Sequence, residues 1–229
     1  MACLPRTHVL GYFSNAPDGA TRSVNRFTSC HPGLALALTA RGEAIHWLVM
    51  GHIRPPRRVK LICGMIGPDH DLMRRAAKMT THAFGEIDLT SEVWAFNATD
   101  YYEVEMGPDL KRWFVSFREL ISPERIAEIK RLTMATETRL AEECLRPASQ
   151  RVVNLDPGYV DLSKLVLATT KDHAHRIYLD RGIYAEVTLR FHQGRWTPWP
   201  WTYPDYAAET YHAFFVQVRQ RLVEQLHGP

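Results

Sequence analysis

Cysteine is scarce in this 229-residue chain, and long hydrophobic runs are missing from it. The four cysteines form no CxxC pair and share no spacing with histidine that is typical of a zinc site. No uncharged apolar run approaches the roughly 18 residues of a membrane-spanning helix, and residues 1–11 lack the apolar core of a signal peptide. The sequence therefore predicts a cytoplasmic protein with reduced thiols and no membrane partner.

The familiar phosphate-binding and catalytic motifs are missing as well. The chain contains no GxxxxGKS/T loop, no GxGxxG after a predicted strand, no HExxH and no GxSxG. Without the phosphate loop, a conventional GTPase is disfavoured.

A strong charge of one sign is also absent. The chain has 28 Lys and Arg against 25 Asp and Glu, a formal net charge of +3. Residues 1–58 contribute +5 (seven Arg against Asp18 and Glu43), so residues 59–229, with 21 basic and 23 acidic side chains, carry −2. The basic balance belongs to the N-terminal quarter, and nucleic acid is only a weakly supported partner for the rest of the chain.

The pattern of the chain changes at two consecutive prolines, Pro55 and Pro56. Residues 1–56 hold turn-forming groups but no helical or strand period that persists, so they are predicted to be disordered or a non-native N-terminal extension. Met50 lies just before the change, and translation could start there or at Met1. Residues 57–227 are predicted to form a single α+β domain.

Apolar periodicity after the prolines predicts a βαββαβ core. One helix is expected after a cap at Asp69, and a longer one after the Ser122-Pro123 pair. The order is the connectivity of a ferredoxin-like antiparallel sandwich with its helices on one sheet face. The expected strands cover residues 59–66, 93–96, 111–118 and 151–155, with 101–106 as a further candidate.

The remaining segments are predicted to extend this core by a C-terminal β-hairpin and a helix. Residues 165–169 are a short apolar run that periodicity alone assigns to neither a helix nor a strand. The hairpin joins residues 176–179 and 183–191, and residues 196–206 form an aromatic, proline-rich strap. The last helix carries the apolar stripe Tyr211, Phe214, Phe215, Val218, Leu222 and Leu226.

One face of the predicted hairpin is polar. A solvated sheet face with ion pairs and the polar floor of a ligand pocket are equally compatible with that pattern. Period-two alternation separates Tyr184, Glu186, Thr188 and Arg190 from Ile183, Ala185, Val187, Leu189 and Phe191.

A phosphate site is the functional interpretation of the cations near this face. Ammonium and guanidinium groups bind phosphate oxygens through charge-assisted hydrogen bonds, so Lys171, Arg176 and Arg190 are the candidate phosphate ligands. The candidate substrate contacts are Tyr101, Tyr178 and Glu186.

The candidates for acid–base chemistry are Glu103, Glu105, Asp156 and His175. On a strand, the two glutamates would share a face about 7 Å apart, a spacing that suits a divalent cation or an acid–base pair. The plainer alternatives are an exposed strand face for the glutamates and a turn cap for Asp156. His173 and His175 lack a third ligand at fixed spacing, so the cofactor is unknown and a divalent metal stays open.

Two functions from different classes follow from these patterns. The first is binding of a phosphorylated small molecule or nucleotide in a polar pocket, with or without a divalent metal and with or without a reaction. The alternative is a non-catalytic module that binds RNA or a protein through the aromatic strap.

A set of short segments is specific when taken together: Val59-Lys60-Leu61 with Gly64, Phe84-Gly85, Thr99 to Gly107, Ser116-Phe117, Asn154 to Tyr159, Leu167 to Lys171, His175 to Leu179, Gly182 to Leu189 and Trp201 to Tyr206. The set resembles a bacterial family known as domain of unknown function 4416, over about residues 58–222. The resemblance implies one folded unit and brings no established activity. Some members carry a GTP-binding label, which implies a phosphate loop that this chain lacks.

Overall fold

The computed structural model describes residues 37–38, 44–45, 52–146 and 150–228. The chain divides into two units, Met1–Arg54 and Pro55–Pro229. In the first unit, β1 (Ala37–Leu38) pairs antiparallel with β2 (Ala44–Ile45). The disorder predicted for residues 1–56 and the alternative start at Met50 lie largely outside the described residues.

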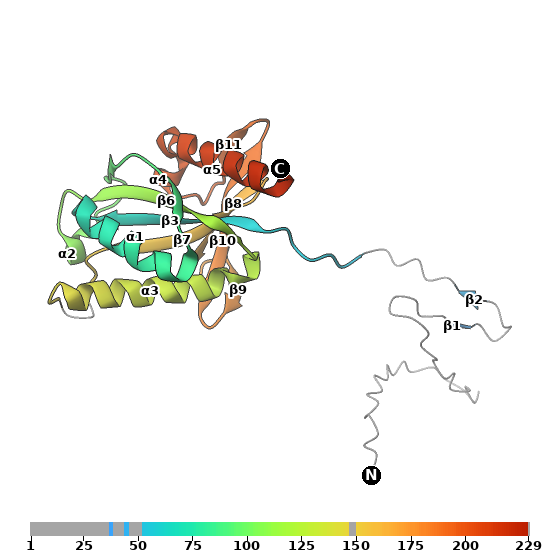
Figure 1. Cartoon of the computed structure of the whole chain (residues 1–229), viewed down its shortest axis with the longest axis horizontal. Coiled ribbons are helices and arrows are strands. Elements are labelled where there is room, and N and C mark those ends of the chain that lie inside the picture. Colours follow the sequence, from blue (N-terminus) through green and yellow to red (C-terminus); the bar gives the residue numbers. More distant parts are fainter. Residues whose placement is uncertain (1–36, 39–43, 46–51, 147–149, 229) are drawn as a thin grey trace, which may run out of the picture. The chain divides into compact units, whose positions relative to one another are not determined.

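The second unit is built on a nine-stranded antiparallel sheet (Figure 1). The strand order is β11-β10-β8-β7-β3-β6-β4, with β5 beside β6 and β9 beside β10. The unit is therefore α+β, as predicted. The strands are β3 (Val59–Gly67), β4 (Ile87–Thr90), β5 (Trp94–Ala95), β6 (Lys111–Ile121), β7 (Asn154–Val160), β8 (Lys164–Thr169), β9 (Ile177–Asp180), β10 (Ile183–His192) and β11 (Arg195–Pro198).

Helices cover both faces of this sheet (Figure 1). The N-terminus of the first is capped as predicted, because the Asp69 carboxylate accepts a 2.9 Å hydrogen bond from the Asp71 amide. The helices are α1 (His70–Phe84), α2 (Glu103–Met106), α3 (Ile126–Glu143) after a 3₁₀ turn (Pro123–Arg125), α4 (Pro204–Ala207) and α5 (Glu209–His227).

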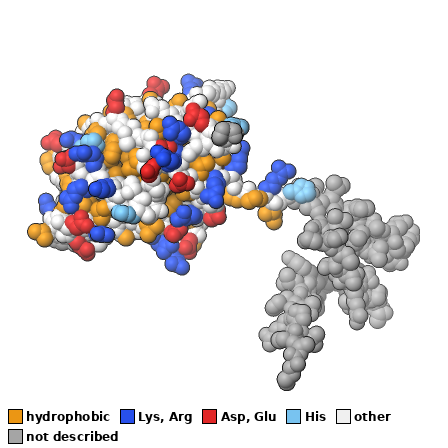
Figure 2. Space-filling view, viewed as in Figure 1, with side chains coloured by type: hydrophobic (Ala, Val, Ile, Leu, Met, Phe, Trp, Pro, Cys, Tyr) orange, Lys and Arg blue, Asp and Glu red, His pale blue; other side chains and the backbone are white. Residues whose placement is uncertain are grey.

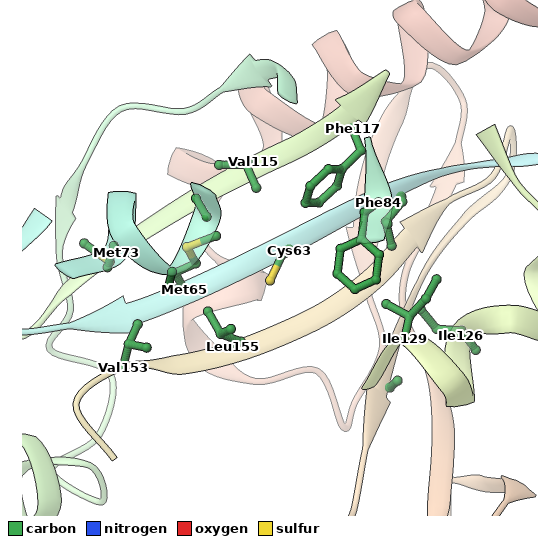
Figure 3. Packing of buried hydrophobic residues seen from close by; sticks show 14 of the residues in the cluster. Cys63, Met65, Met73, Phe84, Val115, Phe117, Ile126, Ile129, Val153 and Leu155 are labelled. Carbon is green, nitrogen blue, oxygen red and sulfur yellow. The ribbon is translucent and has the colours of Figure 1, made fainter. Parts of the chain in front are cut away.

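The first core lies between the sheet and the pair α1 and α3. Odd-numbered residues of β3 and β6 point to this side, as period-two alternation requires. Figure 3 shows the sheet residues Cys63, Met65, Val115, Phe117 and Leu155, together with Val153 just before β7, packed against Met73 and Phe84 of α1 and Ile126 and Ile129 of α3.

The second core lies between the opposite sheet face and α5. The predicted stripe of the last helix is present: Tyr211, Phe214, Phe215, Val218 and Leu222 are buried, and Leu226 is half-buried. These side chains pack on Ile62 of β3, Phe114 of β6 and Leu189 of β10. The helix is therefore held by apolar contacts with three strands that are distant in sequence.

One prediction between residues 87 and 107 is confirmed and one is wrong. The short strand expected at 93–96 is present as the two-residue β5 beside β6, which also pairs with β4, a strand that was not predicted. The candidate strand at 101–106 contains the short helix α2 instead. A turn starts it, because the Thr99 hydroxyl accepts from the Tyr101 amide, and Gly107 ends it at φ 82°.

Strand β7 continues through Pro157-Gly158, where the sequence analysis placed a turn. Asp156 therefore lies inside a strand, opposite Gly64 of β3, and caps no turn. Pairing of β7 with β8 begins only at Gly158 and Leu167, so Pro157 needs no amide hydrogen on that side. A Cβ at Gly158 would lie 2.4 Å from the Val166 carbonyl oxygen, so the close approach of the two strands requires glycine.

The hairpin forms as predicted, but its two faces do not alternate without interruption. The register of β10 against β8 shifts between Val187 and Leu189. Ile183 consequently joins the core beneath α1 and α3, whereas Leu189 joins the core beneath α5. A bulge places two residues of one strand opposite one residue of its partner, so the alternation of residues within a single strand does not predict it.

Candidate functional site

A cavity of about 470 Å³ opens where β7 and β8 separate. The residues of β7 before Gly158 do not pair with the end of β8. The space between these two strand segments is enclosed by α3, by the segment before α2 and by α4. Its charged and aromatic lining is Arg112, Lys130, Arg151, Lys171, Arg176, Asp156, Glu186, Asp205, His173, Phe96, Tyr101, Tyr102, Tyr203 and Tyr206.

The structure brings together half of the residues that the sequence predicted for a site. Tyr101, Asp156, Lys171, Arg176 and Glu186 all line the cavity, although they come from four separate segments of the chain. His175 does not line it but contacts it indirectly, with Nε2 3.2 Å from a Glu186 carboxylate oxygen.

The other predicted residues lie elsewhere. Glu103 is exposed on α2, and Glu105 is held by two hydrogen bonds of 2.7 and 2.8 Å from Arg151. That interaction lowers the pKa of Glu105. Because α2 is a helix, the predicted pairing of the two glutamates on a strand face does not occur. Tyr178 is exposed on β9, and Arg190 lies over the Trp199 ring at 4.7 Å.

Two charged side chains of α3 close the gap that β8 leaves along β7. Glu137 accepts a 2.6 Å hydrogen bond from the Leu155 amide, and Lys130 donates at 2.8 Å to the Leu155 carbonyl oxygen. They replace the backbone partners that a paired strand would supply. Neither residue was predicted for a site, although both share the buried stripe of α3 with Ile126 and Thr133.

Burial raises the pKa of Glu137 to about 7, against the opposing effects of Lys130 and of the Leu155 amide. Since the folded-state value lies above the ordinary one of 4.5, the contribution of this carboxyl group to stability is complete below pH 4.5 and is lost as the pH rises through 7. Relative to Glu137→Gln, the wild-type protein should lose on the order of 3 kcal/mol between pH 4.5 and 8. Urea unfolding of both proteins across that range measures it, and parallel pH profiles would contradict it.

An arginine bridges two acids at the inner end of the cavity. Arg112, 3% exposed, donates to Asp205 at 2.5 Å and approaches Asp156 at 3.5 Å. Asp156 also accepts from the Asn154 amide group at 2.8 Å, and its other oxygen lies 3.7 Å from the Lys130 ammonium. The two cations, Arg112 and Lys130, are thus balanced by the two carboxylates, Asp156 and Asp205.

A tyrosine hydroxyl at the same inner end has no hydrogen-bond partner among the residues that the structure describes. Tyr206 is 2% exposed, and within the described residues nothing hydrogen-bonds to its oxygen. Burial raises its pKa well above the ordinary value, so the hydroxyl stays protonated. A buried polar group without a partner costs free energy unless something else, such as a ligand, supplies the hydrogen bond.

Arg176 is fully engaged with the protein. It donates to Glu186 at 2.8 Å, to the Lys171 carbonyl oxygen at 2.9 Å and to the Tyr203 hydroxyl at 2.9 Å. Because all three guanidinium nitrogens have acceptors, this side chain holds the segment that carries Lys171.

Lys171 itself lies at the exposed rim. Its ammonium group is 4.3 Å from the centre of the Tyr101 ring and forms no ion pair within the described part of the chain. It is thus a cation at the cavity mouth that is free to meet an anion.

A ready set of metal ligands is not among the described residues, where no group of three or more His, Cys, Asp or Glu side chains is placed to hold an ion. The rings of His173 and His175 meet edge to face, 5.8 Å apart. His175 is also bonded to Glu186, which is in turn paired with Arg176.

The aromatic strap is largely packed on itself. Trp199 and Trp201 stack at 5.2 Å, and His175 stacks on Trp201 at 5.5 Å. Basic and acidic side chains are interspersed over the face of the domain in Figure 2. The face seen there therefore carries no continuous basic surface of the kind that binds nucleic acid.

Comparison with known proteins gives one match. A family model described as Domain of unknown function (DUF4416) matches residues 57–222. No curated protein and no solved structure matches the chain. Among the described helices, none combines the length and apolar character needed to cross a bilayer.

Proposed function

The chain belongs to the DUF4416 family, whose description states no activity, and we propose from the cavity that it binds a phosphorylated small molecule or nucleotide. The observation that carries this proposal is Lys171, a cation at the rim that forms no ion pair with any described residue, in a cavity whose inner charges are already paired. A phosphate group there would form charge-assisted hydrogen bonds without breaking an existing ion pair.

The composition and size of the cavity agree with this class of ligand. Five basic residues line it against three acidic ones, and a fourth carboxylate, that of Glu105, pairs with Arg151 from outside the lining, so one positive charge is in excess and an anion is favoured. Tyr101, Tyr102 and Phe96 offer aromatic surface for a ring. The volume of about 470 Å³ lies within the usual range for small-molecule sites.

We also propose that the core is a ferredoxin-like sandwich. The support is the strand order β7-β3-β6-β4, in which each of two βαβ units contributes a strand between the strands of the other. Helices α1 and α3, the crossovers of these units, share one core and therefore one face. The strands β8 to β11 extend the sheet beyond β7 and, by diverging from it, form the cavity.

Binding should appear as a thermal shift that depends on Lys171. With nucleoside mono-, di- and triphosphates or sugar phosphates, with and without Mg²⁺ or Mn²⁺, a ligand at 100 times its Kd should stabilise the wild-type protein by about 2.7 kcal/mol. Lys171→Ala should remove this shift and leave the free protein folded. The matched control is Lys164→Ala, which changes a partly exposed lysine of β8 that is paired with Asp161 outside the cavity.

The alternative function makes a different prediction in the same assay. Trp201 is 37% exposed, the feature that favours an RNA- or protein-binding strap. If single-stranded RNA stabilises the protein, mononucleotides do not, and Trp201→Ala abolishes the effect, the alternative is correct and the small-molecule proposal is wrong.

A further inference from the structure

The charges of the cavity are not distributed evenly between its rim and its inner end. At the inner end, Arg112 and Lys130 are matched by Asp156 and Asp205, all within 4 Å of a partner. Of the other lining cations, the buried Arg176 is matched by Glu186 and Arg151 is matched by Glu105, so the exposed Lys171 at the rim remains. The uncompensated positive charge is therefore at the mouth. An anionic group placed at the inner end would instead meet the carboxylates of Asp156 and Asp205.

The inner end nevertheless has unused hydrogen-bonding capacity. The carboxylate of Asp156 is 23% exposed, the largest fraction among the three acids of the lining. Among the described residues, one of its oxygens accepts no hydrogen bond, since the Lys130 ammonium lies 3.7 Å away, which is too long for one. The buried Tyr206 hydroxyl lies on the same side of the sheet, above Gly64, which pairs with Asp156, and it has no hydrogen-bond partner in the described part of the chain.

We infer that the ligand binds in one orientation, with its phosphate at the rim beside Lys171 and an uncharged part rich in N–H or O–H groups at the inner end, against Asp156 and Tyr206. This inference rests on the proposed function and narrows it. The ligand class is a phosphate ester of a polar molecule long enough to span the cavity, as a nucleoside is, and not an acyl or lipid phosphate. Asp156 accepts a hydrogen bond from the ligand, and Tyr206 exchanges one with it.

Calorimetric titration with matched probes tests the rim and the inner end of the cavity separately. The probes are the four nucleoside 5′-monophosphates, their parent nucleosides and ribose 5-phosphate, which carries the phosphate but lacks the base. Lys171→Ala should weaken the best nucleotide at least about tenfold and leave its nucleoside unchanged. Asp156→Asn and Tyr206→Phe should weaken the nucleotide and its nucleoside by the same factor, several-fold or more, and leave ribose 5-phosphate unchanged.

Tyr206→Phe keeps the experiment decisive if Asp156→Asn does not fold. It removes an oxygen that has no partner in the described structure, so the melting temperature of the free protein should stay level or rise while affinity falls. Tyr178→Phe, outside the cavity, is the matched control and should change neither.

The two proposals fail in different ways. If no probe binds the wild-type protein, the proposed function is wrong and this orientation falls with it. If nucleotides bind but Tyr206→Phe and Asp156→Asn leave the nucleotide unaffected, or weaken ribose 5-phosphate equally, the orientation is wrong and the proposed function stands.

Discussion

Replacing Arg176 by alanine should lower the free energy of unfolding by about 3–5 kcal/mol, because it leaves a buried carboxylate without its cation. The Arg176 and Glu186 side chains are each 2% exposed and are joined by a 2.8 Å hydrogen bond. The substitution also frees the Lys171 carbonyl oxygen and the Tyr203 hydroxyl, which both accept from the same guanidinium group. A large loss of stability would mark Arg176 as a positioning residue.

Denaturant unfolding at neutral pH measures this loss. Arg190→Ala is the matched control on the neighbouring strand: that arginine is exposed and has no carboxylate partner in the described part of the chain, so its removal should change stability by less than about 0.5 kcal/mol. A second variant, Glu186→Gln, removes the buried charge from the other side. If Arg176→Ala is as stable as Arg190→Ala, the pair does not hold the rim, and direct phosphate binding by Arg176 becomes the better explanation.

Replacing Phe215 by alanine should cost a similar 3–5 kcal/mol, through lost apolar burial and a cavity between α5 and the sheet. Phe215 is 0% exposed. Its ring packs against Phe114 at 5.2 Å and stacks parallel to Tyr206 at 6.0 Å. Tyr206 lies on the wall of the candidate site, so the same substitution removes support from the inner end of the cavity.

Val216 is the natural control for this prediction. It follows Phe215 on α5 and is 46% exposed, so Val216→Ala changes the same helix without opening the core. The two variants should differ by at least about 2 kcal/mol in urea unfolding. Equal stabilities would mean that α5 is not held on the sheet by this side chain.

Sequence reasoning alone predicted the elements whose pattern is local. The cap at Asp69, the apolar stripe of α5 and the hairpin of β9 and β10 each depend on residues within a few positions of one another. Periods of 3.6 and 2 residues encode such elements, because they state which side chains share a face. The same reasoning predicted α+β architecture and pointed to Lys171, Asp156 and Glu186, which line one cavity.

Short elements were predicted less well, since four residues contain only about one helical period or two strand periods. Strand β4 was missed, and α2 was taken for a strand. Because residues 103–106 form a helix and not a strand, Glu103 and Glu105 do not line the candidate site. A turn at Thr99 and a glycine at φ 82° decide that segment, and both are weaker patterns than an alternation of apolar and polar residues.

Only the tertiary structure decided where the cavity lies and which charged side chains inside it are already engaged in ion pairs. Three features show this: the divergence of β7 from β8, the bulge of β10 and the Arg112–Asp205 pair. Each depends on residues from different segments, up to 93 positions apart. Strand register and ion pairing depend on how distant segments meet, and no periodicity within a segment records that meeting. This is why the sequence indicated cationic residues near a polar strand, while the fold showed that Arg176 is paired and Lys171 is free to meet a ligand.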